Sequence, residues 1–122
     1  MRVIKVEPHS KPLIIEIENS LTKLQEEVGG YIQVIYPFTD NVGLVCNDEG
    51  KIMGLDYNRA LRNDNGYIYD IVCGNFLIVG LSDDDFKSLT DEQIDKYLKY
   101  YGKIEEYIVM GNQIITIERN EE

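Results

Sequence analysis

Alternating apolar and polar residues near the start of the chain predict a pair of strands. Residues 2–7 alternate as a half-buried strand does, and residues 13–18 are again rich in branched apolar side chains. Pro8 and Pro12 lie between these segments, where they remove backbone donors and favour extended loop backbone. We therefore expect strands 2–7 and 13–18 to form a hairpin.

The period then changes to that of a helix. Asn19 or Ser20 can cap its first turn, and the pair Gly29 and Gly30 is placed to end it. One helical face carries the apolar residues Leu21, Leu24 and Val28. The spacing predicts an amphipathic helix between the cap and the two glycines.

The middle of the chain predicts several short strands separated by turns. The strand-like segments are residues 31–36, 42–46, 51–53, 67–72 and 76–79. Residues 47–50 and 63–66 contain the Asn, Asp and Gly residues typical of tight turns. Residues 55–61 follow neither period, and we expect them to be irregular or to form one helical turn.

Two helix starts and a last hairpin follow. Ser82 and Thr90 each precede a possible capping partner three residues later, at Asp85 and Gln93. The second helix has an apolar stripe of Ile94, Tyr97, Leu98 and Tyr101 and is stopped by Gly102. Residues 103–118 predict a C-terminal hairpin. The whole pattern predicts an α+β fold, with a mostly antiparallel sheet and two or three helices, in a single compact domain over residues 1–122.

The charge balance narrows the classes of partner. The chain has 22 acidic and 12 basic residues, a formal charge of −10 on 122 residues. A negative surface repels nucleic-acid phosphates and anionic lipid headgroups, so we expect no direct nucleic-acid binding and no membrane partner. No apolar run approaches the ~20 residues that span a bilayer, and the N-terminus does not resemble a signal peptide. The sequence therefore predicts a cytoplasmic protein.

The densest acidic segment lies between residues 83 and 95. Asp83, Asp84 and Asp85 cannot converge on one metal ion if they lie on a helix, because consecutive helical residues point about 100° apart. Carboxylates at a helix start are also favoured by the helix dipole. If the acidity serves a partner, the acidic face consists of these three residues together with Asp91, Glu92 and Asp95.

The chain offers few groups for catalysis. His9 stands beside Ser10 with no third group to orient it, so we interpret it as an exposed, incidental histidine. Cys46 and Cys73 lie in apolar segments and are expected to be small buried hydrophobes. The carboxylates Asp40, Asp56 and Asp70 flank strands and could meet, but most carboxylates of so acidic a chain lie on its surface. We predict no catalytic residue, no metal site and no cofactor.

Four of the nine tyrosines lie in segments with a clear pattern. Tyr67 and Tyr69 share one face of a strand, where half-buried packing is favoured over an exposed interaction patch. Tyr97 and Tyr101 lie on the helix stripe and are expected at the rim of the core, with their hydroxyls reaching water.

Asn58 and Arg59 form an unusual polar dipeptide in an apolar neighbourhood. An arginine near a core needs a partner, and its planar fork suits a carboxylate such as Asp70. Pairing of Arg59 with Asp70 is therefore the first interpretation, and a ligand-facing role is the second.

Several of these segments together resemble a known family. The segments are YIQVIYP at 31–37, CNDEGK at 46–51, GLDYNRA at 54–60, IVCGNFLIVG at 71–80 and LTDEQI at 89–94. Their order and spacing resemble the bacterial and phage family called domain of unknown function 3846, over about residues 1–101. The resemblance implies a place among accessory proteins of phages, plasmids and other mobile elements, near anti-restriction genes. It implies no activity, and it carries over only the positions Asn58, Arg59, Gly74 and Gly80, with roles in turn geometry and polar anchoring.

Three functional hypotheses remain. The first is a small acidic, non-catalytic binding protein that inhibits a host defence or nucleic-acid-processing protein, by mimicking the charge of DNA. The second is a small-ligand or nucleotide-binding module that uses Arg59, Arg62, Tyr67 and Asn75. The third is a structural homo-oligomer.

Overall fold

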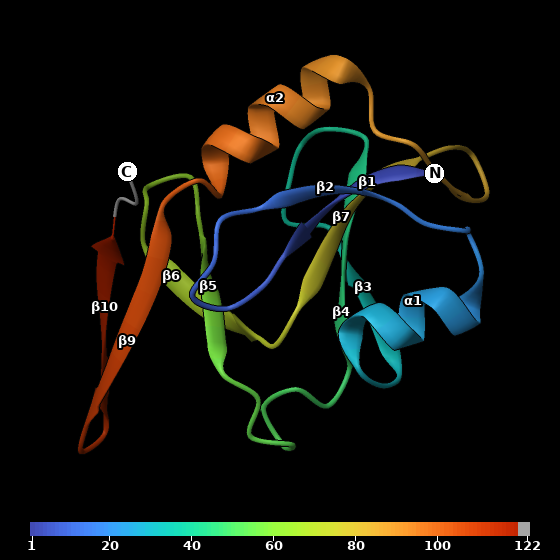
Figure 1. Cartoon of the computed structure of the whole chain (residues 1–122). Helices are drawn as coiled ribbons and strands as arrows, with labels where there is room; N and C mark the ends of the chain where they lie inside the picture. The colour runs from blue at the N-terminus through green and yellow to red at the C-terminus, as the bar shows by residue number, and fades with distance from the viewer. Residues whose placement is uncertain (120–122) are drawn as a thin grey trace.

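A computed structural model describes residues 1–119 of the chain. Its largest part is a six-stranded, wholly antiparallel sheet in which β2, β1, β7, β4 and β3 lie side by side and β8 pairs with the end of β7 (Figure 1). The strands are β1 (Arg2–Val6), β2 (Leu13–Glu16), β3 (Ile32–Ile35), β4 (Val42–Asn47), β7 (Phe76–Leu81) and β8 (Phe86–Lys87).

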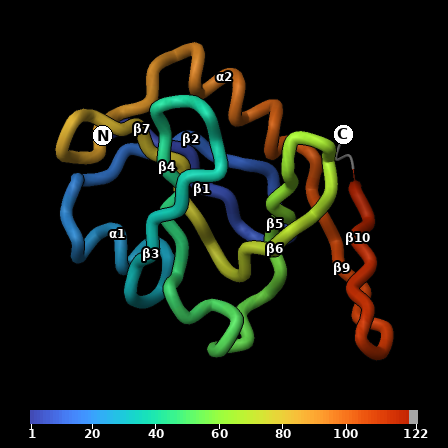
Figure 2. The backbone as a smooth tube through the Cα atoms, turned by 180° about the vertical axis from the view of Figure 1, so that it is seen from behind, coloured from blue at the N-terminus to red at the C-terminus, as the bar shows by residue number. Residues whose placement is uncertain are grey.

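One helix covers each face of this sheet, α1 (Leu21–Val28) on one side and α2 (Asp91–Tyr100) on the other (Figures 1 and 2). Alternate side chains of β7 pack into the two cores that lie between the sheet and the two helices. Phe76 and Ile78 enter the core that α2 covers, whereas Leu77 and Val79 enter the core that α1 covers. All four side chains are fully buried. Because both faces of β7 are covered, its sequence is a continuous apolar run.

Two further hairpins lie beside the central sheet. One consists of β5 (Tyr57–Arg62) and β6 (Ile68–Cys73), and the other of β9 (Ile104–Met110) and β10 (Gln113–Arg119). Both views show the β9–β10 hairpin at one end of the molecule and the 82–85 turn at the opposite end (Figures 1 and 2). The α+β class, the mostly antiparallel pairing and the C-terminal hairpin are confirmed.

Both helices form where capping signals predict them. Ser20 caps α1 by accepting a hydrogen bond from the Lys23 amide, and Gly29 ends it with a positive φ of 79°. Thr90 and Gln93 form the complete, reciprocal capping box at the start of α2. Neither helix in the described part of the chain is long and apolar enough to cross a membrane.

The prediction of a helix that starts at Ser82 is wrong. Residues 82–85 form a tight turn in which the Ser82 amide and hydroxyl both donate to the carbonyl of Asp85, at 2.8 and 2.9 Å. Phe86 then pairs with Leu81 as β8 returns along β7. The hydrogen bonds of a hairpin therefore replace those of the first helical turn.

Two other local predictions are wrong. Residues 51–53 form turns and not a returning strand, because the Met53 amide donates to the Glu49 carbonyl. Residues 57–62 are strand β5 and not irregular or helical. The strand lacks apolar alternation because it buries Asn58 and Arg59 among its apolar residues.

Candidate functional site

Asn58 is fully buried and acts as an anchor between segments. Its side-chain amide donates to the carbonyl of Val6 at 2.9 Å and to the carbonyl of Gly74 at 2.8 Å. Gly74 adopts a positive φ of 82° in the turn between β6 and β7, which favours glycine. Asn58 thereby ties β5 to the end of β1 and to this turn.

Arg59 is also buried, and its partners are neutral oxygens. Its guanidinium donates to the Asn58 side-chain oxygen at 2.9 Å, to the Ser10 carbonyl at 2.8 Å and to the Tyr101 carbonyl at 3.1 Å. Burial lowers the pKa of Arg59 from its ordinary value. These contacts join β5 to the loop after β1 and to the end of α2.

The predicted pairing of Arg59 with Asp70 is wrong. Asp70 lies opposite Leu61 in the β5–β6 register and is half exposed, where it pairs with Lys51. Arg59 lies opposite Val72 and is directed into the core. The turn that connects β5 and β6 sets which residues face one another. The sequence pattern alone did not reveal this register, and so it did not identify the partner of Arg59.

Glu105 is a buried carboxylate that the sequence pattern does not reveal. It accepts hydrogen bonds from the Ala60 amide at 2.7 Å, from Arg62 at 2.6 Å and from the Tyr107 hydroxyl at 3.1 Å. It thereby fastens β9 to β5. Asn58, Arg59 and Glu105 are together called the polar junction below.

The helix tyrosines are buried more deeply than predicted. Tyr97 and Tyr101 are 1% and 2% exposed, so the prediction that both lie at the core rim is wrong. The Tyr97 hydroxyl donates to Asp40 at 2.8 Å, and Lys96 bonds the same carboxylate oxygen. Lys96 and then Tyr97 lower the pKa of Asp40, which belongs to this contact and does not meet Asp56 or Asp70.

A large open cleft separates the β5–β6 hairpin from the β9–β10 hairpin. Its volume is about 920 Å³. Its walls include the apolar and aromatic residues Tyr57, Ile68, Ile71, Tyr107 and Ile114. Its charged lining consists of His9, Lys51, Asp56, Asp70 and Glu106. Asp56 and Asp70 therefore do share a site, although both already have cationic partners.

His9 is held between two carboxylates and is not incidental. Its Nδ1 lies 2.7 Å from Glu106, and its Nε2 lies 3.2 Å from Asp56. Arg119 donates to the other oxygen of Glu106 at 3.1 Å and to the His9 carbonyl at 3.3 Å. The Ser10 hydroxyl donates to Pro8, so His9 and Ser10 do not form a nucleophile and base pair.

Tyr67 and Tyr69 are exposed, with 72% and 59% of their surface accessible. The half-buried packing that we favoured for them is wrong. Tyr69 lines the cleft, and Tyr67 precedes β6 in the turn. Their exposure suits the alternative interpretation, in which they contribute to a contact surface.

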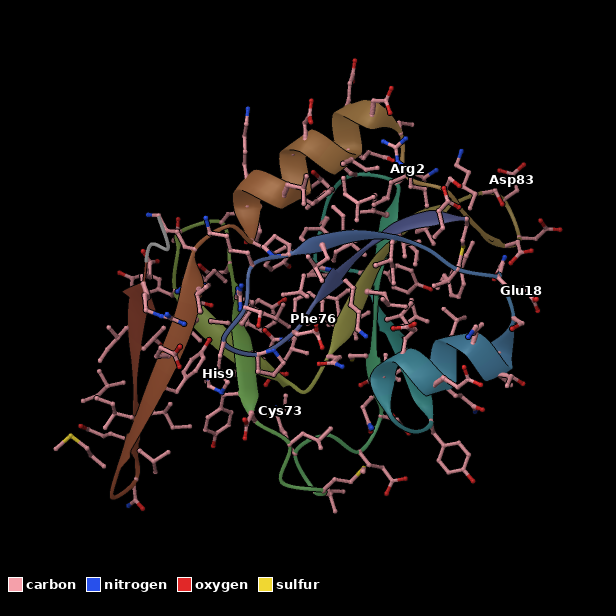
Figure 3. The ribbon with its side chains drawn as sticks, in the orientation of Figure 1. Arg2, His9, Glu18, Cys73, Phe76 and Asp83 are labelled. Carbon is pink, nitrogen blue, oxygen red and sulfur yellow. The ribbon has the colours of Figure 1, made fainter. Side chains whose placement is uncertain are left out.

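The acidic residues singled out by sequence lie at the end opposite the cleft. The Asn19 side chain donates to Asp85 at 3.1 Å and to the Phe86 carbonyl at 3.2 Å, which brings Glu18 beside the 82–85 turn. Figure 3 shows Glu18 and Asp83 at one edge of the molecule, with His9 and Cys73 in the other half. We call Glu18, Asp83, Asp84 and Asp85, with Asp91 and Glu92 at the start of α2, the acidic end.

Cations compensate the acidic end only in part. Asp91 pairs with Arg2 at 2.9 Å. Within residues 1–119, the carboxylates of Glu18, Asp83 and Asp84 form no salt bridge and are exposed. Asp95 is likewise exposed, further along α2. Glu18 had not been predicted, because only the fold brings it to this end.

The sequence model of one family, the domain of unknown function 3846 (DUF3846), matches residues 1–102. The chain belongs to the DUF3846 family. The match confirms the resemblance and includes Asn58, Arg59, Gly74 and Gly80, whereas the β9–β10 hairpin lies outside it. No curated protein and no solved structure is significantly similar to the chain.

In this DUF3846 chain Gly80 lies within strand β7 and not in a turn, and it allows a close approach of another backbone segment. A Cβ atom there would lie 2.7 Å from the Ser88 carbonyl oxygen and 2.9 Å from that of Lys87. The segment carrying β8 therefore approaches β7 too closely for any side chain at this position.

The two cysteines are free and buried, as predicted. Burial raises the pKa of Cys46 to about 11, so its thiol is protonated and unreactive near neutral pH.

The pKa of His9 is predicted to lie above its ordinary value, because Glu106 and then Asp56 bond its protonated ring. His9 is the only histidine in the chain, so one NMR titration of its ring signals measures this pKa. Glu106→Gln should lower it. The raised pKa means that this contact stabilises the fold fully below the unfolded pKa and less as pH rises through the folded pKa. A His9 pKa at or below 6.5, or one unchanged by Glu106→Gln, would contradict the arrangement.

Proposed function

We propose that this DUF3846 chain is a small, non-catalytic binding protein of a phage or other mobile element. It acts in the cytoplasm on a host defence or nucleic-acid-processing protein and occupies, with its acidic end, a basic site that otherwise holds DNA or RNA. The anti-defence role rests on the family's mobile-element context, and the contact surface rests on the structure.

The observation that carries the proposal is the gathering of carboxylates from three separate segments at one end. Glu18 precedes α1, Asp83 and Asp84 lie in the turn before β8, and Glu92 begins α2. Nucleic-acid enzymes present clustered Lys and Arg to phosphates. Exposed carboxylates held on one rigid end can meet such a cluster, and their field speeds association with it.

Affinity capture from a nuclease-treated bacterial lysate, at low and moderate salt, is the test of this proposal. The tagged protein should retain a nucleic-acid-binding protein that dissociates as salt rises, because the contact is ionic. The variant Glu18→Lys/Asp83→Lys/Asp84→Lys should weaken its binding by about tenfold or more. Mass spectrometry of the retained proteins gives the readout.

The matched control is Asp48→Lys/Glu49→Lys/Asp64→Lys, which makes the same change in net charge at exposed carboxylates elsewhere on the surface. This control should bind nearly as well as the unchanged protein. Equal binding by all three proteins would contradict the proposal. So would a captured partner without affinity for nucleic acid.

A second candidate function is the binding of a small phosphate-bearing ligand. Arg59 and Arg62, both predicted for this role, line a cavity of about 260 Å³ together with Lys99 and Lys103. Glu105 and Glu118 also line it, so four cations face two carboxylates in a chain whose net charge is −10. Tyr67 and Asn75, predicted for the same ligand, do not line this cavity, and Asn75 bonds the Glu27 carbonyl instead.

Titration with pyrophosphate, followed by backbone amide chemical shifts, tests this candidate. Saturable shifts should centre on residues 59–62 and 99–105, and Lys99→Gln/Lys103→Gln should weaken them. Lys11→Gln/Lys23→Gln is the control, because it removes the same charge from exposed lysines outside the cavity. The absence of saturable shifts would exclude the phosphate role.

A further inference from the structure

The β9–β10 hairpin has the geometry of a regular, unprotected ribbon. Its two-residue turn, with Gly111 at a positive φ of 60°, is followed by seven consecutive residue pairs without a bulge. β10 is the outermost strand at this end of the molecule (Figure 1). An isolated two-stranded hairpin is only marginally stable in water, so such a ribbon gains from further strands.

The turn of the hairpin and the strand residues next to it carry no formal charge, although the chain as a whole is highly charged. Residues 107–117, YIVMGNQIITI, contain no Asp, Glu, Lys or Arg, although these make up 28% of the sequence. Six large apolar side chains there are 42% to 60% exposed. They are Ile108, Val109, Met110, Ile114, Ile115 and Ile117.

These six side chains lie on the two faces of the ribbon, because side chains alternate along each strand. Ile108, Met110, Ile115 and Ile117 share one face, and no other element of the described chain covers them. Val109 and Ile114 lie on the other face, where Ile114 lines the cleft. Exposed apolar residues that cluster on one face are typical of a contact surface.

The free edge of β10 presents its backbone groups at alternate residues. A two-residue turn makes Met110 and Gln113 a hydrogen-bonded pair, and the same pattern recurs at every second pair along the ribbon. Residues 113, 115 and 117 therefore bond inward to β9. The amides and carbonyls of Ile114, Thr116 and Glu118 point outward along the free edge.

We propose that two copies of the chain pair through this edge. β10 of one copy runs antiparallel to β10 of the second about a two-fold axis at Thr116, and the two hairpins form one four-stranded sheet. Thr116 then faces Thr116 of the second copy, and Ile115 faces Ile117 of the second copy. Thr–Thr and branched apolar pairs are both favourable across strands.

Charge limits where two copies can pair and in which register. Two molecules of charge −10 repel one another, and pairing through β10 brings only Glu118 and Arg119 of each copy, among charged residues, into the shared pair of strands. With the axis at Thr116 all seven residues of β10 find partners, and Glu118 faces Ile114. An axis at Glu118 would instead set two glutamates opposite one another and would shorten the pairing.

The acidic end stays accessible in such a dimer, because it lies at the opposite end of each molecule from the hairpin (Figures 1 and 2). The dimer does not depend on the proposed inhibitory function, and either can fail without the other.

Sedimentation equilibrium of the purified full chain over a range of concentrations tests the dimer. The mass should rise with concentration from 14.1 kDa to about twice that value. Thr116→Pro should weaken dimerisation at least about tenfold, because proline removes an outward amide and leaves the β9–β10 hydrogen bonds in place. Thr116→Val keeps the amide and the branched side chain, and it should dimerise like the unchanged protein.

A second pair of variants is independent of the proline. Ile115→Lys/Ile117→Lys should be monomeric, whereas Ile52→Lys, at an exposed apolar residue in the 47–55 loop, should not change the association. An unchanged protein that remains monomeric at every concentration would overturn the proposal. A dimer that survives Thr116→Pro would overturn pairing through this edge.

Discussion

The guanidinium of Arg59 must find its oxygen partners inside the protein, because the side chain is almost wholly buried. Those oxygens belong to Asn58, Ser10 and Tyr101, in β5, the loop after β1 and the end of α2. An unsatisfied buried cation is very unfavourable, so the packing of β5 is stable only together with these segments. Asn58 adds the end of β1 and the turn before β7. Through Glu105 the same network then reaches β9.

This polar junction explains why the molecule has two unlike ends. The central sheet and α2 carry the acidic end, whereas the junction attaches the two hairpins on the far side (Figure 1). One end offers exposed carboxylates, and the other offers the exposed apolar residues of β9 and β10. Ionic and apolar contacts suit different partners and respond oppositely to salt, so the two ends can act separately.

The sequence predicted the elements whose signals are local. The caps at Ser20 and Thr90 and the apolar run of β7 needed only neighbouring residues. It could not predict contacts that depend on distant segments. The partners of Arg59 lie as far as 49 residues away, and those of His9 as far as 110. Ser82 has a good capping pattern, but pairing of β8 with β7 overrode it. Glu18 joined the acidic end only because the fold brings Asn19 to Asp85.

Hydrogen exchange of backbone amides in Arg59→Lys tests the central role of the junction most directly. Lysine keeps the charge, but its single nitrogen cannot replace both Nη2, which bonds the Ser10 and Tyr101 carbonyls, and Nη1, which bonds the Asn58 side chain. Amides of β5 and β9 should exchange at least about tenfold faster, while those of β4 and β7 change less. Arg2→Lys, the same substitution at an exposed salt bridge, should leave all of these rates nearly unchanged. Unchanged protection of β5 and β9 in a folded Arg59→Lys protein would contradict the account.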